Sequence, residues 1–108
     1  MNNAARIAAL NDAFRANPSL GTFVLTVGIL TDMPQDVEAI LNKVRTFKDF
    51  NESNDPYGEH DFGAFDFKGK KIFGKIDYYD RNFEFPSPDA ADASITNRVL
   101  TVMYADEY

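Results

Sequence analysis

The chain has 108 residues, which is enough for one domain and too few for two. It contains no cysteine, so disulfides, thiolate nucleophiles and cysteine-based zinc sites are excluded, and no apolar run approaches the roughly 20 residues that span a bilayer. The net charge of −6 argues against direct binding of nucleic acid, because affinity for the phosphate backbone comes from cationic side chains.

The first half of the chain predicts a helix, a strand and a second helix. Apolar residues recur at helical spacing between Asn3 and Ala16. Alternating apolar and β-branched residues predict a strand over Thr22–Leu30. The second helix is expected to begin at Asp32, where Gln35 would complete a capping box, and an apolar stripe then runs over 37–47.

The second half predicts three strands and a long loop. Asp61–Phe67 and Lys71–Tyr79 read as strands joined by a hairpin at Lys68-Gly69-Lys70. Residues 80–96 contain two prolines with Ser and Asp, and indicate a loop. A last strand is expected over Arg98–Tyr104.

The element order α-β-α-β-β-β predicts an α+β fold. We expect one cytoplasmic domain over 1–108, a two-layer sandwich with an antiparallel sheet of about four strands and two helices on one face. The other face of this sheet would display Lys75, Asp77 and Tyr79, which share one side of their strand.

Acidic residues are concentrated in two segments of the second half. Asp49–Asp61 carries five acids and no Lys or Arg, and Asp77–Asp92 carries five acids against Arg81 alone. Such segments favour a protein partner with a basic surface, with tyrosines as amphipathic anchors. The candidate partner-binding residues are Asp49, Glu52, Asp55, Tyr57, Glu59, Asp61, Asp77, Tyr78, Tyr79, Asp80 and Glu84.

The single histidine supports an alternative interpretation. His60 stands between Glu59 and Asp61, and a histidine beside a carboxylate is suited to general-base chemistry. With Asp77 and Tyr79 it would form an enzymatic or ligand-binding cluster, provided that these side chains converge in a concave pocket. The sequence supplies no convincing nucleophile, so a binding protein is the preferred hypothesis.

A metal site has only incomplete support. Asp49–Asp55 spaces oxygen ligands at alternate residues, as a calcium loop does. The sixth position holds Asn54 instead of Gly, and the twelfth holds His60 instead of Glu. A mixed site of His60, Asp61 and Asp77 would have little specificity. We therefore expect no metal and no cofactor.

Several motifs resemble a known family of small proteins. The segments Asn54–Phe65, Lys75–Asp80, Ser87–Asp89 and Arg98–Thr101 are similar to a family filed as domain of unknown function 3768, and Ile7–Phe14 resembles its N-terminus. The resemblance covers nearly the whole chain. It implies no catalytic residue, because the family carries no assigned activity.

What the resemblance implies is a genomic setting, because such proteins are expected on plasmids and integrated elements of alphaproteobacteria. Small acidic proteins in that setting often resemble inhibitors of host defence. The first hypothesis is therefore a monomeric or homodimeric anti-CRISPR or antirestriction protein, which occupies the DNA-binding surface of a host complex such as a CRISPR surveillance complex. It would contact neither nucleic acid nor a membrane directly. A plasmid-maintenance factor with an unnamed partner is a third possibility.

Overall fold

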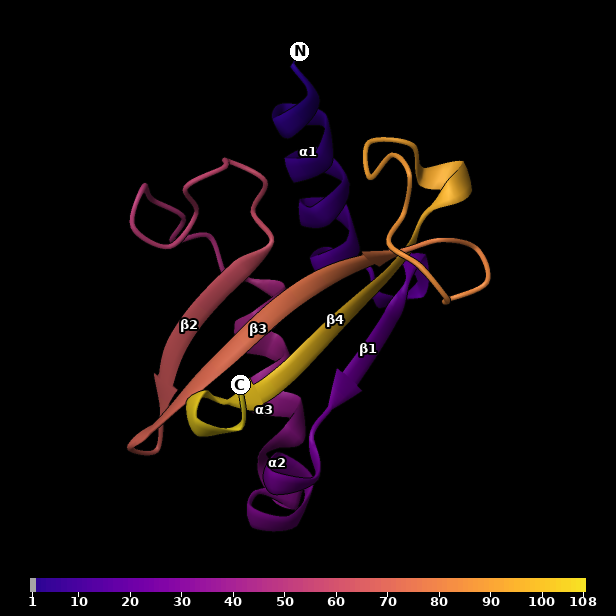
Figure 1. The fold of residues 1–108 in the computed structure, drawn as a ribbon. Helices are drawn as coiled ribbons and strands as arrows, with labels where there is room; N and C mark the ends of the chain where they lie inside the picture. The colour runs from indigo at the N-terminus through magenta and orange to yellow at the C-terminus, as the bar shows by residue number, and fades with distance from the viewer. Residues whose placement is uncertain (1) are drawn as a thin grey trace.

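The computed structural model describes residues 2–108 and confirms the α+β class, with α1 and α3 packed on one face of a four-stranded sheet (Figure 1). The strands lie in the order β1-β4-β3-β2. In chain order the main elements are α1 (Asn3–Ala16), β1 (Thr22–Leu25), α2 (Val27–Asp32), α3 (Val37–Arg45), β2 (Phe62–Phe67), β3 (Lys70–Tyr79) and β4 (Asn97–Tyr104).

The hydrophobic core lies between these helices and the sheet. Phe14 of α1 and Ile40 of α3 are fully buried, and they belong to one apolar cluster with Ile72 of β3 and Leu100 of β4. Val44, one turn after Ile40, extends the buried stripe of α3 as the helical spacing predicts. The apolar residues at alternate positions of β3 and β4 thus pack the sheet against the helical layer.

The sheet is mixed, and the prediction of a purely antiparallel sheet is wrong for β1. β3 runs antiparallel to both β2 and β4, but β1 pairs in parallel with β4, with Thr22 opposite Val99 and Leu25 opposite Val102. Parallel neighbours need a long crossover connection. Here residues 26–96 supply it, carrying two helices and the β2–β3 hairpin.

The strand predicted over Thr22–Leu30 ends early, at Leu25. The backbone N–H of Thr26 donates the last sheet bond to Val102 (3.1 Å), and α2 begins at the next residue. The Thr26 hydroxyl donates to Glu107 Oε1 at 2.7 Å, and Ile29 turns into the core. The contact with the C-terminal segment is 81 residues away in sequence, so local alternation could not reveal it.

The second long helix begins later than predicted. Asp32 is the last residue of α2, a 3₁₀ turn covers Pro34–Asp36, and α3 starts at Val37. The expected capping box of Asp32 and Gln35 is absent, because Asp32 lies at the end of α2 and not before a helix. Asp36, which precedes α3, makes no side-chain cap bond, and its carboxylate accepts from Lys68 Nζ at 3.0 Å. A contact with the β2–β3 hairpin therefore replaces the local cap.

The hairpin and the long loop agree with the prediction. Lys68 and Gly69 have φ values of +49° and +79°, the left-handed pair of a two-residue type I′ turn. Residues 80–96 form the loop before β4, and a single bridge between Tyr79 and Pro86 closes its first half.

Candidate functional site

A buried polar network joins α1 to the sheet. The side chain of Asn11 is fully buried, and its Nδ2 donates to the Glu59 carbonyl and to the Tyr78 hydroxyl, both at 2.9 Å. Its Oδ1 accepts from Arg98 Nε at 2.8 Å. The Tyr78 hydroxyl in turn donates to Glu59 Oε1 at 2.9 Å. Asn11 thus uses both ends of its amide to hold together three distant segments of the chain.

Burial shifts the pKa of both partners of Asn11 on the sheet. Burial raises the pKa of Tyr78, so the phenol keeps the proton that it donates to Glu59. Burial lowers the pKa of Arg98, whose guanidinium lies 5.2 Å from the centroid of the Tyr78 ring and donates to the carbonyl of Ala90. These bonds leave Arg98 committed to a structural role.

His60 lies in a second polar cluster, against α1. Its Nδ1 is 2.9 Å from Asp12 Oδ1, and its Nε2 is 3.7 Å from Asp55 Oδ2. The His60 ring stacks on Phe50 with 4.2 Å between centroids and 2° between planes. Arg15 lies 4.7 Å from the centre of the same Phe50 ring, donates to the His60 carbonyl at 2.7 Å and pairs with Asp12.

This cluster borders a groove of about 280 Å³ on the helical side of the molecule. We call it the helix-side groove. It lies between the C-terminal parts of α1 and α3 and is lined by Asp12, Arg15, Arg45, Thr46, Phe47, Lys48, Phe50 and His60.

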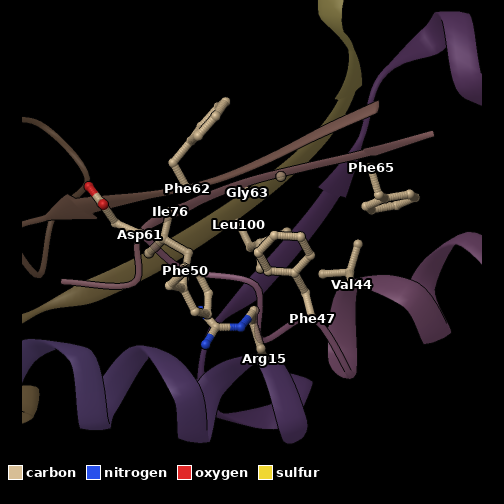
Figure 2. Close-up of a pocket in the computed structure, with 11 residues that line it drawn as sticks. Arg15, Val44, Phe47, Phe50, Asp61, Phe62, Gly63, Phe65, Ile76 and Leu100 are labelled. Carbon is tan, nitrogen blue, oxygen red and sulfur yellow. The ribbon is translucent and has the colours of Figure 1, made fainter. Parts of the chain in front are cut away.

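A small apolar cavity lies between this cluster and the sheet. Figure 2 shows Phe47 and Phe50 under the sheet beside Gly63, with Arg15 below them on α1, while Phe62 points away on the opposite side of the strand. The cavity measures about 20 Å³, close to the volume that one water molecule needs. It is therefore a packing gap, too small for a ligand.

A third concavity, of about 350 Å³, is lined by acids and aromatic rings. Burial raises the pKa of Asp61 at its edge, and the nearby carboxylates of Glu59, Asp55 and Asp77 raise it further. We call it the acidic groove. Its lining residues are Asp61, Ile76, Asp77, Tyr78, Tyr79, Glu84, Phe85 and Pro86.

The lip of the acidic groove is a tight loop ordered by one carboxylate. Asp80 Oδ1 accepts from the backbone N–H groups of Asn82 (3.1 Å) and Glu84 (3.0 Å), and the Asp80 N–H donates to the Phe85 carbonyl at 2.8 Å. Phe83 has a φ of +57°, and its ring lies 6.2 Å from that of Tyr79. The loop therefore holds Glu84 and Phe85 at the rim, where the Phe85 side chain stays exposed.

The structure gathers several predicted partner-binding residues in the acidic groove and disperses others. Asp61, Asp77, Tyr78, Tyr79 and Glu84 line the groove, although they come from the residue before β2, from β3 and from the loop that follows β3. The remaining predicted residues, Asp49, Glu52, Asp55, Tyr57, Glu59 and Asp80, lie outside its lining.

Among these outer residues, Asp55 is a correction. Its side chain is only 5% exposed, and its carboxylate accepts from the backbone N–H groups of Glu59 and His60, both at 3.1 Å. Asp55 therefore orders the loop and presents no carboxylate to a partner. Glu59 is likewise bound to the Tyr78 hydroxyl. Asp49, Glu52 and Tyr57 remain exposed.

The alternative catalytic residues do not form one hydrogen-bonded group. His60 contacts Asp12 in the helix-side groove, whereas Asp77 and Tyr79 line the acidic groove. Asp77 pairs with Lys75 at 3.1 Å, and Glu59 binds Tyr78. Within residues 2–108, no group of three His, Asp or Glu side chains is arranged to hold a metal ion.

Sequence reasoning missed the residues of α1 and β4 that build these sites. Asn11 lies four residues after Ile7 and three before Phe14, on the stripe that the structure buries. A polar amide on an apolar helical stripe is a signal for a buried hydrogen bond. Arg98 carried no such signal, because its partner Asn11 is 87 residues away.

No helix within the described range 2–108 is long and apolar enough to cross a bilayer. No curated protein and no solved structure matches the chain. Residues 23–107 match the model of one family, described as "Protein of unknown function (DUF3768)". The match begins after α1, so Asn11, Asp12 and Arg15 lie outside it. Because the match covers most of the sequence, the chain belongs to this family.

Proposed function

We propose that this protein is a non-enzymatic binding protein whose acidic groove receives a basic segment of another protein. The observation that carries the proposal is the composition of the groove: three carboxylates, from Asp61, Asp77 and Glu84, beside the rings of Tyr79 and Phe85. Carboxylates pair with guanidinium and ammonium groups, and aromatic rings attract the same cations through their π-faces.

The state of each carboxylate supports a basic ligand. Glu84 lies exposed on the rim. Asp77 is held by Lys75 in a half-exposed ion pair of the kind that is worth about 1 kcal/mol or less, so an incoming guanidinium can replace Lys75 at low cost. Asp61 is half buried beside other acids, and a cation in the groove would relieve that repulsion.

The charge of the whole chain supports a partner that handles nucleic acid. A surface that binds DNA or RNA is rich in Lys and Arg, and a chain with a net charge of −6 is attracted to such a surface. In its most specific form the proposal names a host defence complex, of the kind that anti-CRISPR or antirestriction proteins inhibit. The acidic side chains would occupy the place of nucleic-acid phosphates.

A pull-down with charge-reversed variants tests this proposal. The protein is immobilised and exposed to a nuclease-treated alphaproteobacterial lysate, and bound proteins are eluted with duplex DNA and identified by mass. We expect a nucleic-acid-binding protein that the double variant Asp77→Lys/Glu84→Lys retains at least tenfold less. The control Glu38→Lys/Asp66→Lys has the same change in charge at exposed sites outside the groove.

Circular dichroism spectra of both double variants test whether the fold is kept. The proposal fails if the two variants lose the partner equally, because the effect would then be one of net charge. It also fails if nothing that DNA displaces is retained by the unaltered protein.

A further inference from the structure

We propose that the helix-side groove is a second binding site, for a phosphoryl group. Its position on the helical side of the molecule separates it from the acidic groove, and the two share no lining residue. Three cationic side chains, Arg15, Arg45 and Lys48, line it together with His60. In a chain with a net charge of −6, this groove has the opposite charge to the molecule as a whole.

The cations of the groove are incompletely neutralised. The only carboxylate in the lining is that of Asp12, which is already engaged by Arg15 and His60. Lys48 forms no ion pair within residues 2–108, and the ion pair of Arg45, with Glu38, is long at 3.4 Å. Glu38 is a weak partner because its side chain is 85% exposed to water.

Arg45 also carries an unsatisfied donor. Its Nε is buried and has no hydrogen-bond partner in the part of the chain that the structure describes. A buried N–H without an acceptor is costly, and such groups in folded proteins need an explanation. Arg binds phosphate and carboxylate oxygens in a two-pronged geometry, so an oxyanion in the groove would accept this bond once the Arg45 side chain turns its Nε toward the groove.

One wall of the groove is fixed before any ligand arrives. Arg15 is held by the His60 carbonyl at 2.7 Å and by the Phe50 ring at 4.7 Å, and Figure 2 shows its guanidinium directly beside that ring. A cation that is already immobilised loses little entropy on binding. The volume of about 280 Å³ is near the lower end for ligand pockets and suits a small anion.

The charge count selects a phosphoryl group over a carboxylate. A phosphate monoester carries a charge between about −1.5 and −2 near neutral pH and offers three acceptor oxygens, whereas a carboxylate carries one charge and two oxygens. Three cations against the one carboxylate of Asp12 leave two positive charges in the lining, which a dianion balances more closely than a carboxylate does.

A titration by nuclear magnetic resonance tests this inference. Inorganic phosphate is added to the ¹⁵N-labelled protein at constant ionic strength, with chloride and acetate as parallel titrants. We expect saturable shifts of the amides of Arg45, Thr46, Lys48 and His60 with phosphate at millimolar or lower concentration. Acetate should bind at least fivefold more weakly, and chloride should produce no saturation.

Matched substitutions locate the site. Arg45→Gln and Lys48→Gln should each weaken phosphate binding at least fivefold, whereas Lys43→Gln, a lysine of α3 outside the lining, should leave it unchanged. The inference is overturned if the phosphate shifts never saturate, if acetate binds equally well, or if Arg45→Gln/Lys48→Gln still binds phosphate. The variant Asp77→Lys/Glu84→Lys should keep phosphate binding, which separates this site from the acidic groove.

Discussion

Asn11 shows how one side chain can determine the position of a helix. Both functional groups of its amide are bonded, to Glu59 and Tyr78 on one side and to Arg98 on the other. A fully satisfied buried network rigidifies a structure, whereas a partly satisfied one is costly. The network therefore fixes α1 against the sheet and sets where Asp12 and Arg15 lie.

Removing this amide should be strongly destabilising. Asn11→Ala leaves Arg98 Nε without its acceptor and two further groups without their donor, so we expect the free energy of unfolding to fall by about 3 kcal/mol. Urea unfolding measures the change. Asn42→Ala, on the exposed surface of α3, is the control and should change stability by less than about 0.5 kcal/mol. Equal effects of the two substitutions would show that the network contributes nothing specific.

Asp61 gives the protein a defined dependence on pH. Burial raises the pKa of its carboxyl group above the ordinary value of 3.8. Between the unfolded and the folded pKa, the folded protein holds a proton that the unfolded chain has released. The free energy of unfolding therefore falls as the pH rises through this window, and above the folded pKa the full cost of burying the charged carboxylate lowers the stability.

The substitution Asp61→Asn removes the cost of burying a charged carboxylate at this position. We expect the variant to have a higher Tm than the unaltered protein at pH 7, and the difference should shrink as the pH falls below 3.8, where Asp61 is protonated in both states. Thermal unfolding between pH 3 and pH 7 measures it. Asp66→Asn, at a well-exposed carboxylate, serves as the control. A difference in Tm that is the same at every pH would contradict the explanation.

At the scale of single residues, composition predicted part of the acidic groove and nothing of the buried network. Asp61, Asp77, Tyr78, Tyr79 and Glu84 stood out as acidic and aromatic residues of the second half of the chain, and all five line the acidic groove. The role of Asp55 could not be read in the same way, because burial depends on the fold of the whole loop. The pairing of Asn11 with Arg98 is likewise a property of tertiary structure.

Among the elements, strong periodicity gave accurate predictions and weak local signals did not. The bounds of α1 agree with the helical spacing, and β3 begins one residue earlier than predicted. The sequence from Thr22 to Leu30 alternates along its whole length, yet only its first four residues pair with β4. The rest forms α2 because Thr26 and Ile29 find long-range contacts there, which outweigh the local strand propensity.

Two paired glycines provide a matched test of packing in the sheet. Gly63 of β2 lies opposite Gly74 of β3. A Cβ on Gly63 would lie 2.6 Å from Phe47 Cε2, whereas a Cβ on Gly74 would have its nearest neighbour at 4.0 Å, on Leu100. Of the two positions, only position 63 requires glycine, because the Phe47 ring packs directly against its backbone.

We therefore expect Gly63→Ala to lower the free energy of unfolding by about 1–3 kcal/mol through overpacking, and Gly74→Ala to leave it unchanged or slightly raised. Urea unfolding of both variants checks this. Adding Phe47→Leu to the Gly63→Ala variant should restore part of the lost free energy of unfolding, because the smaller side chain makes room for the new Cβ. Equal losses in the two alanine variants would refute the packing argument.

For the molecule as a whole, α1 is an integral part of the domain even though the family match begins at residue 23. Phe14 and Asn11 are both fully buried, and Arg15 contacts the loop that carries His60. Loss of a buried Phe alone costs about 3–5 kcal/mol, which is comparable to the roughly 5–15 kcal/mol that keeps a typical domain folded.

Deleting residues 1–17 should therefore abolish cooperative unfolding. The measurement is a thermal unfolding curve monitored by circular dichroism, together with the dispersion of amide resonances. Deleting only residues 1–3, which include no buried side chain among those described, should leave a sharp transition. A cooperative transition in the longer deletion would show that residues 18–108 fold without α1.

The direction of β1 illustrates what sequence patterns leave open at this scale. Alternation shows that a strand exists, but the same alternation occurs in strands that pair in parallel and in strands that pair antiparallel. The class of the fold could be predicted because it depends on element types and their order. The mixed sheet could not, because the choice of β4 as the partner of β1 is made across more than seventy residues.

That pairing has a consequence for the order of events during folding. Within residues 2–108 the only partner strand of β1 is β4, and Thr22 lies opposite Val99. During synthesis, α1, β1, α2 and α3 leave the ribosome before any strand of the sheet exists for β1 to join. The N-terminal half must wait for β4, so the domain folds only after β4 has been synthesised. Non-local pairing of this kind slows folding, and we expect chaperones to meet the N-terminal half while its apolar surfaces are still uncovered.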